Sequence, residues 1–141
     1  MIGFHCSHEQ HSPSALLRYA TLAAQAGFAH AMCSDHFAPW SARQGHSGNA
    51  WSWLGAALQA TPMTFGTVCA PGQRYHPAIV AQAAATLAEM YPDRLWLALG
   101  SGEALNEAIV GAGVEFSVRT HDDAGVAVTG RRRQHDLFKS E

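Results

Sequence analysis

A strand–helix–strand pattern between residues 63 and 99 decides the fold. The sequence reads MTFGTVC at 63–69, PAIVAQAAATLAEM at 77–90 and LWLAL at 95–99. The two outer runs are short and mostly apolar, which is typical of strands that are covered on both faces. The middle run begins with proline and carries one broad apolar face, which predicts a helix. Because a helical crossover of this kind joins parallel strands, these residues predict a right-handed βαβ unit.

The residues before this unit repeat the pattern. An apolar run at 1–6 predicts a first strand. Residues 12–27 predict a helix, with a serine at the cap, a proline at the first helical position and a glycine at the end. Residues 30–34 predict a second strand, and residues 51–58 predict one face of a second helix. The predicted order of elements is therefore β-α-β-α-β-α-β.

The first predicted turn favours a barrel over an open dinucleotide-binding sheet. The segment Ser7-His8-Glu9-Gln10 stands where such a sheet carries a glycine-rich fingerprint. A complete (β/α)8 barrel uses roughly 250 residues, and four strand–helix steps make about half of it. We predict an α/β fold, the N-terminal half of a (β/α)8 TIM barrel with four parallel strands and three to four helices.

The composition changes character near residue 107. The 141 residues are 48% hydrophobic and 14% charged with a net charge of −2, which excludes a disordered chain and gives no support to nucleic-acid binding. However, residues 1–107 hold ten charged side chains, and the much shorter segment 108–141 holds another ten. We predict a half-barrel over 1–107, followed over 108–141 by a divergent, frameshifted or recombined tail with short strand-like runs.

The cysteines and the N-terminus predict a cytoplasmic protein. Cys6, Cys33 and Cys69 contain no C-x-x-C pair, so we expect reduced, buried thiols and neither a disulfide framework nor a zinc ribbon. The sequence has no apolar run of membrane-spanning length, and the first residues lack the basic region of a signal peptide.

Three histidines, His5, His8 and His11, raise the question of a metal site. The segment from His8 to His11 is one residue short of the zinc motif H-E-x-x-H, and it follows a strand instead of lying on a helix. We therefore expect no metal, and a small metal-binding α/β protein is kept as the third hypothesis.

Polar side chains follow the ends of the predicted strands. Asp35-His36 comes after the second strand with Trp40 nearby, and a Gly-Ser-Gly-Glu segment at 100–103 follows the fourth. Because ligands of parallel α/β folds bind at the carboxyl ends of the strands, we expect these groups to face one mouth. Ionisable groups are scarce in this apolar segment, which favours an active site over loops that merely face water.

Several segments, taken in order, resemble the luciferase-like monooxygenase family. They are SDHFAPW at 34–40, QGHS at 44–47, AWSWLG at 50–55, RYHPAIVAQA at 74–83 and GSGEALNE at 100–107. The resemblance covers residues 1–107 and is strongest to a branch of flavin-dependent oxidoreductases akin to the deazaflavin-dependent glucose-6-phosphate dehydrogenases. It implies a (β/α)8 barrel that binds FMN or a deazaflavin across the strand ends. Because the segment Thr67-Val68-Cys69 of the third strand is one residue shorter than in that branch, and Ala70-Pro71-Gly72-Gln73 differs from it too, we expect FMN first and a deazaflavin as the alternative.

The resemblance also implies roles for single residues. His36 would lie against the cofactor ring and handle a proton, with Asp35 orienting it, and Trp40 would wall the substrate side. Glu103 would be a proton donor, and a bulge in the third strand, often with a non-prolyl cis peptide bond, would support the ring. The predicted catalytic residues are His36, Glu103 and Trp40, and the predicted cofactor-binding residues are Asp35, His36, Thr67, Val68, Cys69, Ser101, Gly102, Glu103 and Asn106.

Three hypotheses follow from these observations. The first is a flavin-dependent oxidoreductase or monooxygenase that acts on a small molecule, in a truncated form with weak or no activity. The second is a non-catalytic fragment that keeps the motifs, and the third is the metal-binding protein. The open edges of a half-barrel also predict aggregation or pairing with another half-barrel. We expect neither a nucleic acid nor a membrane as a partner.

Overall fold

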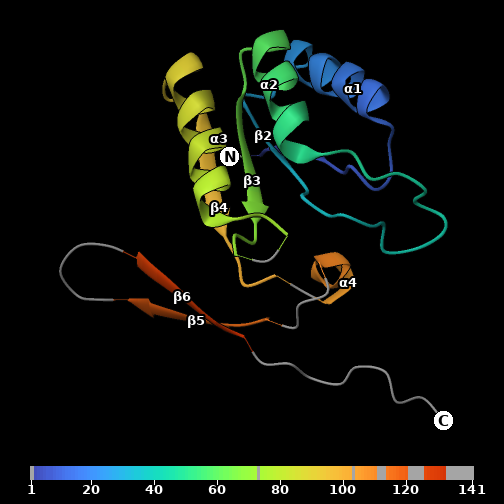
Figure 1. Cartoon of the computed structure of the whole chain (residues 1–141). Helices are drawn as coiled ribbons and strands as arrows, with labels where there is room; N and C mark the ends of the chain where they lie inside the picture. The colour runs from blue at the N-terminus through green and yellow to red at the C-terminus, as the bar shows by residue number, and fades with distance from the viewer. Residues whose placement is uncertain (1, 73, 103, 111–113, 121–125, 133–141) are drawn as a thin grey trace.

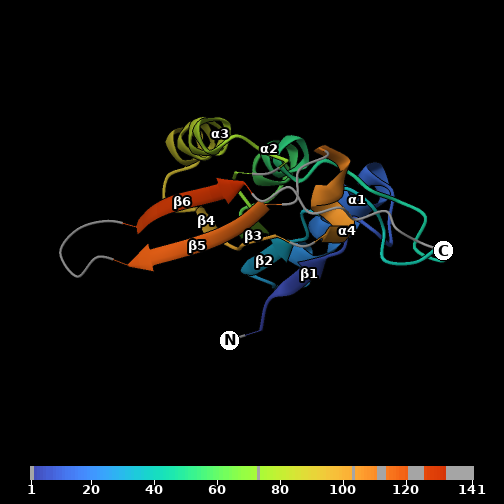
Figure 2. The same ribbon diagram turned by 60° about the horizontal axis from the view of Figure 1, so that its bottom comes forward.

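Four parallel strands form one sheet in the order β1-β2-β3-β4. The computed structural model describes residues 2–72, 74–102, 104–110, 114–120 and 126–132. The strands are β1 (Phe4–Cys6), β2 (His30–Cys33), β3 (Thr64–Cys69) and β4 (Leu95–Leu99). Helices α1 (Pro13–Gln25), α2 (Ala50–Ala60) and α3 (Pro77–Met90) connect them and lie together on one face of the sheet (Figures 1 and 2). The predicted order of strands and helices is confirmed, and the arrangement is that of the N-terminal part of a (β/α)8 barrel.

Each connecting helix begins at a side chain that accepts a hydrogen bond from the first turn. Ser12 accepts from the backbone N–H of Ala15, and Asn49 accepts from that of Ser52 at 2.9 Å. The side chain of His76 caps α3 in the same way. Such caps satisfy backbone donors that have no partner inside the helix, which is why the sequence marks these starts so clearly.

The helices bury an apolar core against the outer face of the sheet. The core contains Cys6, Ala31, Cys33 and Phe65 from the strands, packed against Leu16, Ala20, Trp53, Leu54 and Leu58 from α1 and α2. Leu54, Leu58 and Phe65 are fully buried. Burying a side chain of this size contributes roughly 1.5–3 kcal/mol, so this layer supplies most of the stabilisation of the fold.

The opposite face of the sheet carries a row of paired residues that no described helix covers. His5, Met32, Gly66 and Trp96 are partners across the four strands. The indole of Trp96 is 42% exposed and lies so close over Gly66 that a Cβ there would be 1.9 Å from the ring. Position 66 therefore requires glycine. In a complete barrel this face points to the interior, where side chains from neighbouring strands fill the space.

Short elements follow β4. The turn α4 (Ala104–Glu107) leads into the 3-10 turn η1 (Ala108–Val110), and strands β5 (Val114–Thr120) and β6 (Val126–Arg132) pair antiparallel in a separate two-stranded sheet. Two strands thus stand where the sequence predicts short strand-like runs. The predicted domain boundary at residue 107 stays a prediction.

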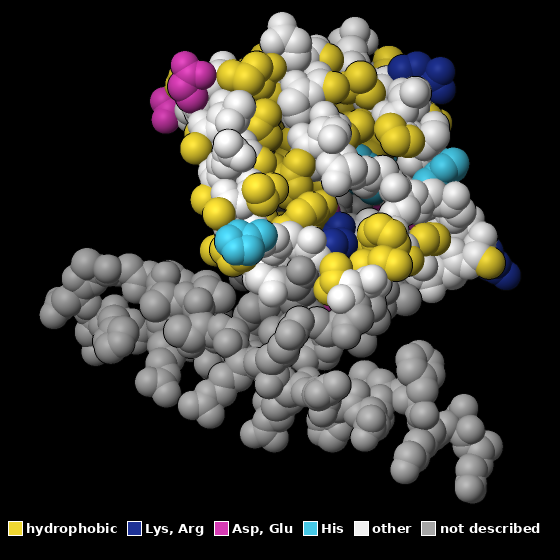
Figure 3. All heavy atoms as spheres, viewed as in Figure 1, with side chains coloured by type: hydrophobic (Ala, Val, Ile, Leu, Met, Phe, Trp, Pro, Cys, Tyr) yellow, Lys and Arg dark blue, Asp and Glu magenta, His cyan; other side chains and the backbone are white. Residues whose placement is uncertain are grey.

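Hydrophobic side chains gather over α2 and α3 on the face shown in Figure 3, and α3 contributes exposed apolar surface. It buries Val80 and Leu87 but leaves Ile79 56% and Met90 54% exposed. In the part of the chain that the structure describes, no helix combines the length and apolar character needed to cross a bilayer.

Candidate functional site

A cavity of about 670 Å³ lies at the carboxyl ends of the four strands. Its size falls within the range typical of small-molecule sites. Its polar walls come from Ser7, Glu9 and Gln10 after β1, Ser34, Asp35, His36, Trp40 and Gln44 after β2, and Ser101, Asn106 and Glu107 after β4. Asp35, His36 and Trp40, which the sequence places at one mouth formed by the strand ends, line this one cavity.

One wall of the cavity is the Glu9 cluster, which consists of Glu9, Ser7, Ser34 and His36. The carboxylate of Glu9 is 3% exposed. Its Oε2 accepts hydrogen bonds from Ser7 Oγ at 2.7 Å and Ser34 Oγ at 2.9 Å. Its Oε1 lies 2.5 Å from His36 Nδ1. Burial acts to raise the pKa of Glu9, but these hydrogen bonds outweigh it and hold the pKa below its ordinary value.

The contact with Glu9 determines which ring nitrogen of His36 carries the hydrogen. An ionised Glu9 can only accept, so Nδ1 of His36 carries the hydrogen that it donates, and in the neutral ring Nε2 keeps its lone pair. His36 lines the cavity, and Trp40 packs edge-on against its ring at 5.3 Å between centroids and 82° between planes. The imidazole and the indole therefore lie side by side at the cavity, and the roles predicted for these two residues stay predictions.

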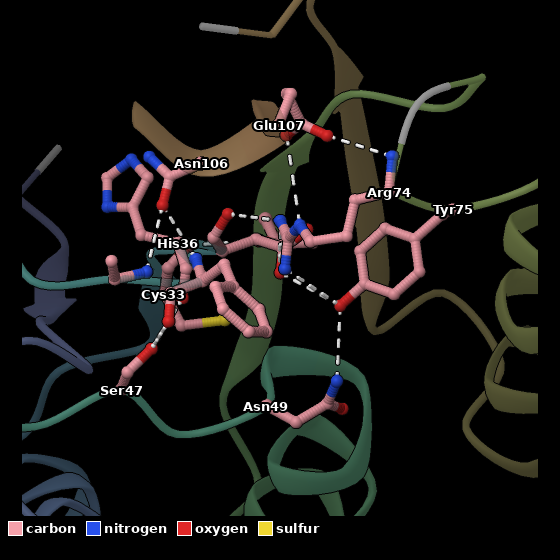
Figure 4. Close-up of polar contacts among 12 residues, drawn as sticks. Cys33, His36, Ser47, Asn49, Arg74, Tyr75, Asn106 and Glu107 are labelled. Carbon is pink, nitrogen blue, oxygen red and sulfur yellow. Dashed lines mark hydrogen bonds and ion pairs between the residues drawn. The ribbon is translucent and has the colours of Figure 1, made fainter. Parts of the chain in front are cut away.

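A second set of contacts beside the cavity is the Arg74 cluster, which consists of Arg74, Asp35, Tyr75 and Glu107. Asp35 and Glu107 line the cavity, and Arg74, Tyr75 and Glu107 are labelled in Figure 4. Arg74 Nη2 donates to the backbone oxygen of Asp35 at 2.8 Å and lies 3.2 Å from Asp35 Oδ1. Tyr75 donates its hydroxyl to the same Oδ1 at 3.2 Å. The expectation that Asp35 orients His36 is wrong: this carboxylate is engaged by Arg74 and Tyr75, and His36 is oriented by Glu9.

Asp35 keeps one oxygen without a partner. The residue is 7% exposed and lines the cavity, and among the described residues its Oδ2 has no hydrogen-bond partner. Burial raises the pKa of Asp35, and the neighbouring Arg74 guanidinium and Tyr75 hydroxyl only partly counter this. A buried acceptor without a donor is costly, so this oxygen is suited to a donor on a ligand.

Asn106 ties the loop after β2 to α4. Its side chain is 1% exposed, and its Oδ1 accepts from the backbone N–H groups of Phe37 at 2.7 Å and Ala38 at 3.1 Å. Ser47 holds the same loop from the other side by donating to the backbone oxygen of His36 at 2.9 Å. These contacts hold the loop that carries His36 and Trp40 in place.

The remaining predicted cofactor-binding residues lie on β3 and in the loop after β4, and most of them line the cavity. Val68 is 46% exposed and lines the cavity together with Cys69, Ser101 and Gly102. Thr67 does not line it: its buried hydroxyl donates to the backbone oxygen of Cys33 at 3.1 Å. Alternation along the strand separates Thr67 from Val68, since neighbouring residues point to opposite faces, whereas Cys69 lines the cavity as the last residue of β3. Glu103 lies outside the described residues.

The predicted bulge in the third strand is not present. Each residue from Phe65 to Cys69 keeps its partner between Leu95 and Leu99, so the pairing of β3 with β4 is unbroken. The described residues contain no cis peptide bond. The segment Thr67–Cys69 is a regular strand up to the cavity.

The three histidines of the metal hypothesis have separate surroundings. His5 lies on the open face of the sheet, His8 is fully buried with Trp53 edge-on at 5.0 Å, and the ring of His11 packs against Tyr19. Among the described residues, no three histidine, cysteine, aspartate or glutamate side chains form a group that could hold a metal ion. The third hypothesis gains no support from the structure.

A family model described as luciferase-like monooxygenase matches residues 2–127 of the chain. This match continues past residue 107, where the sequence resemblance ended. Two relatives are F420-dependent glucose-6-phosphate dehydrogenases, from Beutenbergia cavernae and Intrasporangium calvum. Each is 48% identical to the chain, over 112 and 113 residues, which cover 78% and 79% of the chain but 33% and 34% of the relative.

A solved structure agrees with these relatives. It is an F420-dependent secondary alcohol dehydrogenase in complex with an F420-acetone adduct, with a TM-score of 0.75 and 46% sequence identity over 78% of this chain and 34% of that one. The chain thus spans about a third of the length of the proteins it matches. All three are named for F420, a deazaflavin, so the comparisons agree with the predicted alternative and do not support the first expectation, FMN.

Proposed function

The chain belongs to the luciferase-like monooxygenase family, and on that basis we propose that it forms part of an oxidoreductase site that uses a deazaflavin of the F420 type. The proposed substrate is a small molecule with a hydroxyl-bearing carbon, the group that a sugar and a secondary alcohol share. The observation that carries the proposal is His36, whose Nδ1 lies 2.5 Å from the buried carboxylate of Glu9 at the edge of the cavity. The names of the relatives support the choice of cofactor and substrate class.

The residues around the cavity fit a flat ring that carries polar edges. Val68 and Met32 line it with apolar surface that such a ring would cover. Asp35 Oδ2 is a buried acceptor without a partner among the described residues and fits an N–H group of the ring. Gly102 adopts a φ of +80°, in the left-handed region that favours glycine, and lets the backbone turn at the mouth. We propose that Asp35, Val68, Cys69, Ser101, Gly102 and Asn106 hold the cofactor.

A bound deazaflavin supplies hydride transfer, and the chain supplies the position of the substrate and control of its proton. His36 accepts the hydroxyl proton at Nε2. The positive imidazole that results is stabilised at Nδ1 by the ionised carboxylate of Glu9. Trp40 restricts access of water to His36 from the side on which its ring packs.

The test is a fluorescence titration of the 141-residue chain with F420. We expect saturable binding by the wild-type chain, binding weakened by about tenfold or more in Asp35→Asn, which removes a charged acceptor, and unchanged affinity in His30→Ala. His30 is a suitable control because it lies at the amino end of β2 and does not line the cavity. A wild-type chain that shows no saturable binding contradicts the proposal.

Turnover is the second part of the test. Because the relatives are about three times as long, we expect the chain alone to reduce F420 slowly when given secondary alcohols or sugar phosphates. His36→Ala should lower this rate far more than it lowers affinity for F420. The rival hypothesis, a non-catalytic fragment, predicts neither saturable binding nor turnover.

A further inference from the structure

We propose that Arg74 is a positioning residue of the cofactor site, which holds Asp35 as an ionised acceptor at the cavity and fixes α4 beside it. The inference rests on the proposed function, because it concerns the same cavity. It adds a residue that does not line the cavity and that acts through the side chains that do.

Arg74 joins three loops at the carboxyl edge of the sheet (Figure 4). It lies between β3 and α3, and its Nη2 reaches Asp35 after β2, at 2.8 Å to the backbone oxygen and 3.2 Å to Oδ1. Its backbone N–H donates to Glu107 Oε2 in α4 at 2.9 Å, and its Nε lies 3.8 Å from Glu107 Oε1. Asp35 precedes His36 and Glu107 follows Asn106, so the position of Arg74 is transmitted to two residues that line the cavity.

The guanidinium is itself held in one orientation. It lies over the ring of Tyr75 at 4.5 Å, and its Nη1 donates to the Tyr75 hydroxyl at 3.3 Å. That hydroxyl also accepts from Asn49 Nδ2 at 3.1 Å and donates to Asp35 Oδ1 at 3.2 Å. One donor and two acceptors match what a phenol can offer. A planar fork that pairs and stacks at once is a property of arginine that lysine does not share.

Only one of the two Asp35 carboxylate oxygens is occupied by protein donors, and the other is available to a ligand. Oδ1 accepts from Tyr75 and pairs with Arg74, whereas Oδ2 is buried with no partner among the described residues. The charged and titratable groups that act on Asp35 or respond to it are Arg74, Tyr75, His36, Cys33 and Cys69. Arg74 is the cation among them that pairs with Asp35 directly. Without it, burial favours the protonated carboxyl, which carries a hydrogen and loses part of its capacity to accept.

The experiment compares F420 binding by the wild-type chain, Arg74→Lys, Arg74→Gln and the control Arg18→Gln, which removes the same charge from an exposed position on α1. We expect the dissociation constant to increase from wild type to Arg74→Lys to Arg74→Gln, and to change by about tenfold or more in the last. As the pH is lowered, the affinity of Arg74→Gln should fall relative to that of the wild-type chain, because removing the guanidinium favours the protonated form of Asp35. Adding Asp35→Asn to Arg74→Gln should abolish the pH dependence.

The outcomes separate this inference from the proposed function. Wild-type binding together with unchanged binding by both Arg74 variants overturns the inference alone. Weakening by the same factor at every pH also overturns it, since that is the result of a purely structural role. If Arg74→Gln does not fold, the dissociation constant of Arg74→Lys for F420 is the deciding measurement. A dissociation constant equal to that of the wild-type chain overturns the inference, and a higher one supports it. A wild-type chain that binds no F420 overturns the proposed function and the inference with it.

Discussion

The Glu9 cluster and the Arg74 cluster each contain a buried carboxylate at the same cavity, and they shift its pKa in opposite directions. Glu9 is surrounded by two hydroxyls and an imidazole, and its pKa is lowered. Asp35 is paired with a guanidinium and a phenol on one oxygen only, and its pKa is raised. Environments that push the pKa values of neighbouring acids apart are typical of active sites, where the two acids do different work.

The two clusters also differ in reach. The Glu9 cluster joins residues that follow β1 and β2, which are neighbouring strands. The Arg74 cluster joins the loops after β2, β3 and β4. Under the proposed function, the first cluster has a local role in proton handling and the second holds the cavity together. The predictions below test this division.

The largest effect on stability is expected from Arg74→Ala. The Arg74, Asp35 and Glu107 side chains are 11%, 1% and 4% exposed, so removing the cation leaves two buried carboxylates without their counter-charge. We expect the free energy of unfolding to fall by about 3–5 kcal/mol, measured by urea denaturation. The exposed-site control Arg18→Ala should change it by no more than about 0.5 kcal/mol. A loss below about 1 kcal/mol in Arg74→Ala would show that the cluster does not hold the loops together.

The next largest effect is a loss of stability in acid at His8, the residue before Glu9. His8 is fully buried, and burial lowers its pKa from 6.5 to about 4. Because the folded state resists protonation, stability should fall as the pH decreases from 6.5 and level off below about 4, by up to about 3 kcal/mol. The measurement is urea unfolding at a series of pH values. His8→Leu should flatten this part of the profile, and an unchanged profile would contradict the assignment to His8.

A smaller effect on stability, with a large effect on chemistry, is expected from Glu9→Gln. Ser7, Ser34 and His36 then lose a charged acceptor, which should cost about 1–3 kcal/mol. A lowered pKa in the folded state means that Glu9 contributes stability above its ordinary value of 4.5 and loses it as the pH falls through the lowered value. Asp35, with a raised pKa, has the opposite sign. Urea unfolding between pH 3 and about 7 should therefore show that Glu9→Gln and Asp35→Asn change the pH slope in opposite directions. If both substitutions changed the pH slope of the unfolding free energy in the same direction, the proposed contrast between the two carboxylates would be wrong.

The strands, the helices and the gathering of polar residues at the strand ends could be predicted from the sequence because local signals specify them. Proline at the first helical position, apolar faces at helical spacing and short apolar runs each act within a few residues. The carboxyl ends of parallel strands then meet at one edge, which is why Asp35, His36 and Trp40 were predicted together.

The partner of His36 was predicted wrongly because the role of Asp35 was taken from the family resemblance, and a signal in the register of the strands was not used. Cys6 pairs with Cys33 in the sheet, and Glu9 and His36 each lie three residues beyond their member of that pair. Residues that follow paired positions of neighbouring parallel strands by the same number of residues tend to lie side by side. Counting three residues from Cys6 and from Cys33 would therefore have identified Glu9 as the partner of His36. The Arg74 cluster offers no such signal, because Asp35 and Glu107 lie 39 and 33 residues from Arg74 in sequence and meet it through loops.

The most direct test of the division between the clusters is a titration of F420 against Glu9→Gln and Arg74→Gln side by side. The account predicts that Glu9→Gln binds F420 within about twofold of the wild-type chain, because Glu9 acts on the substrate proton through His36. It predicts that Arg74→Gln binds about tenfold or more weakly, because a charged acceptor for the ring is lost. Equal losses of affinity in the two variants, or a greater loss in Glu9→Gln, would contradict the account.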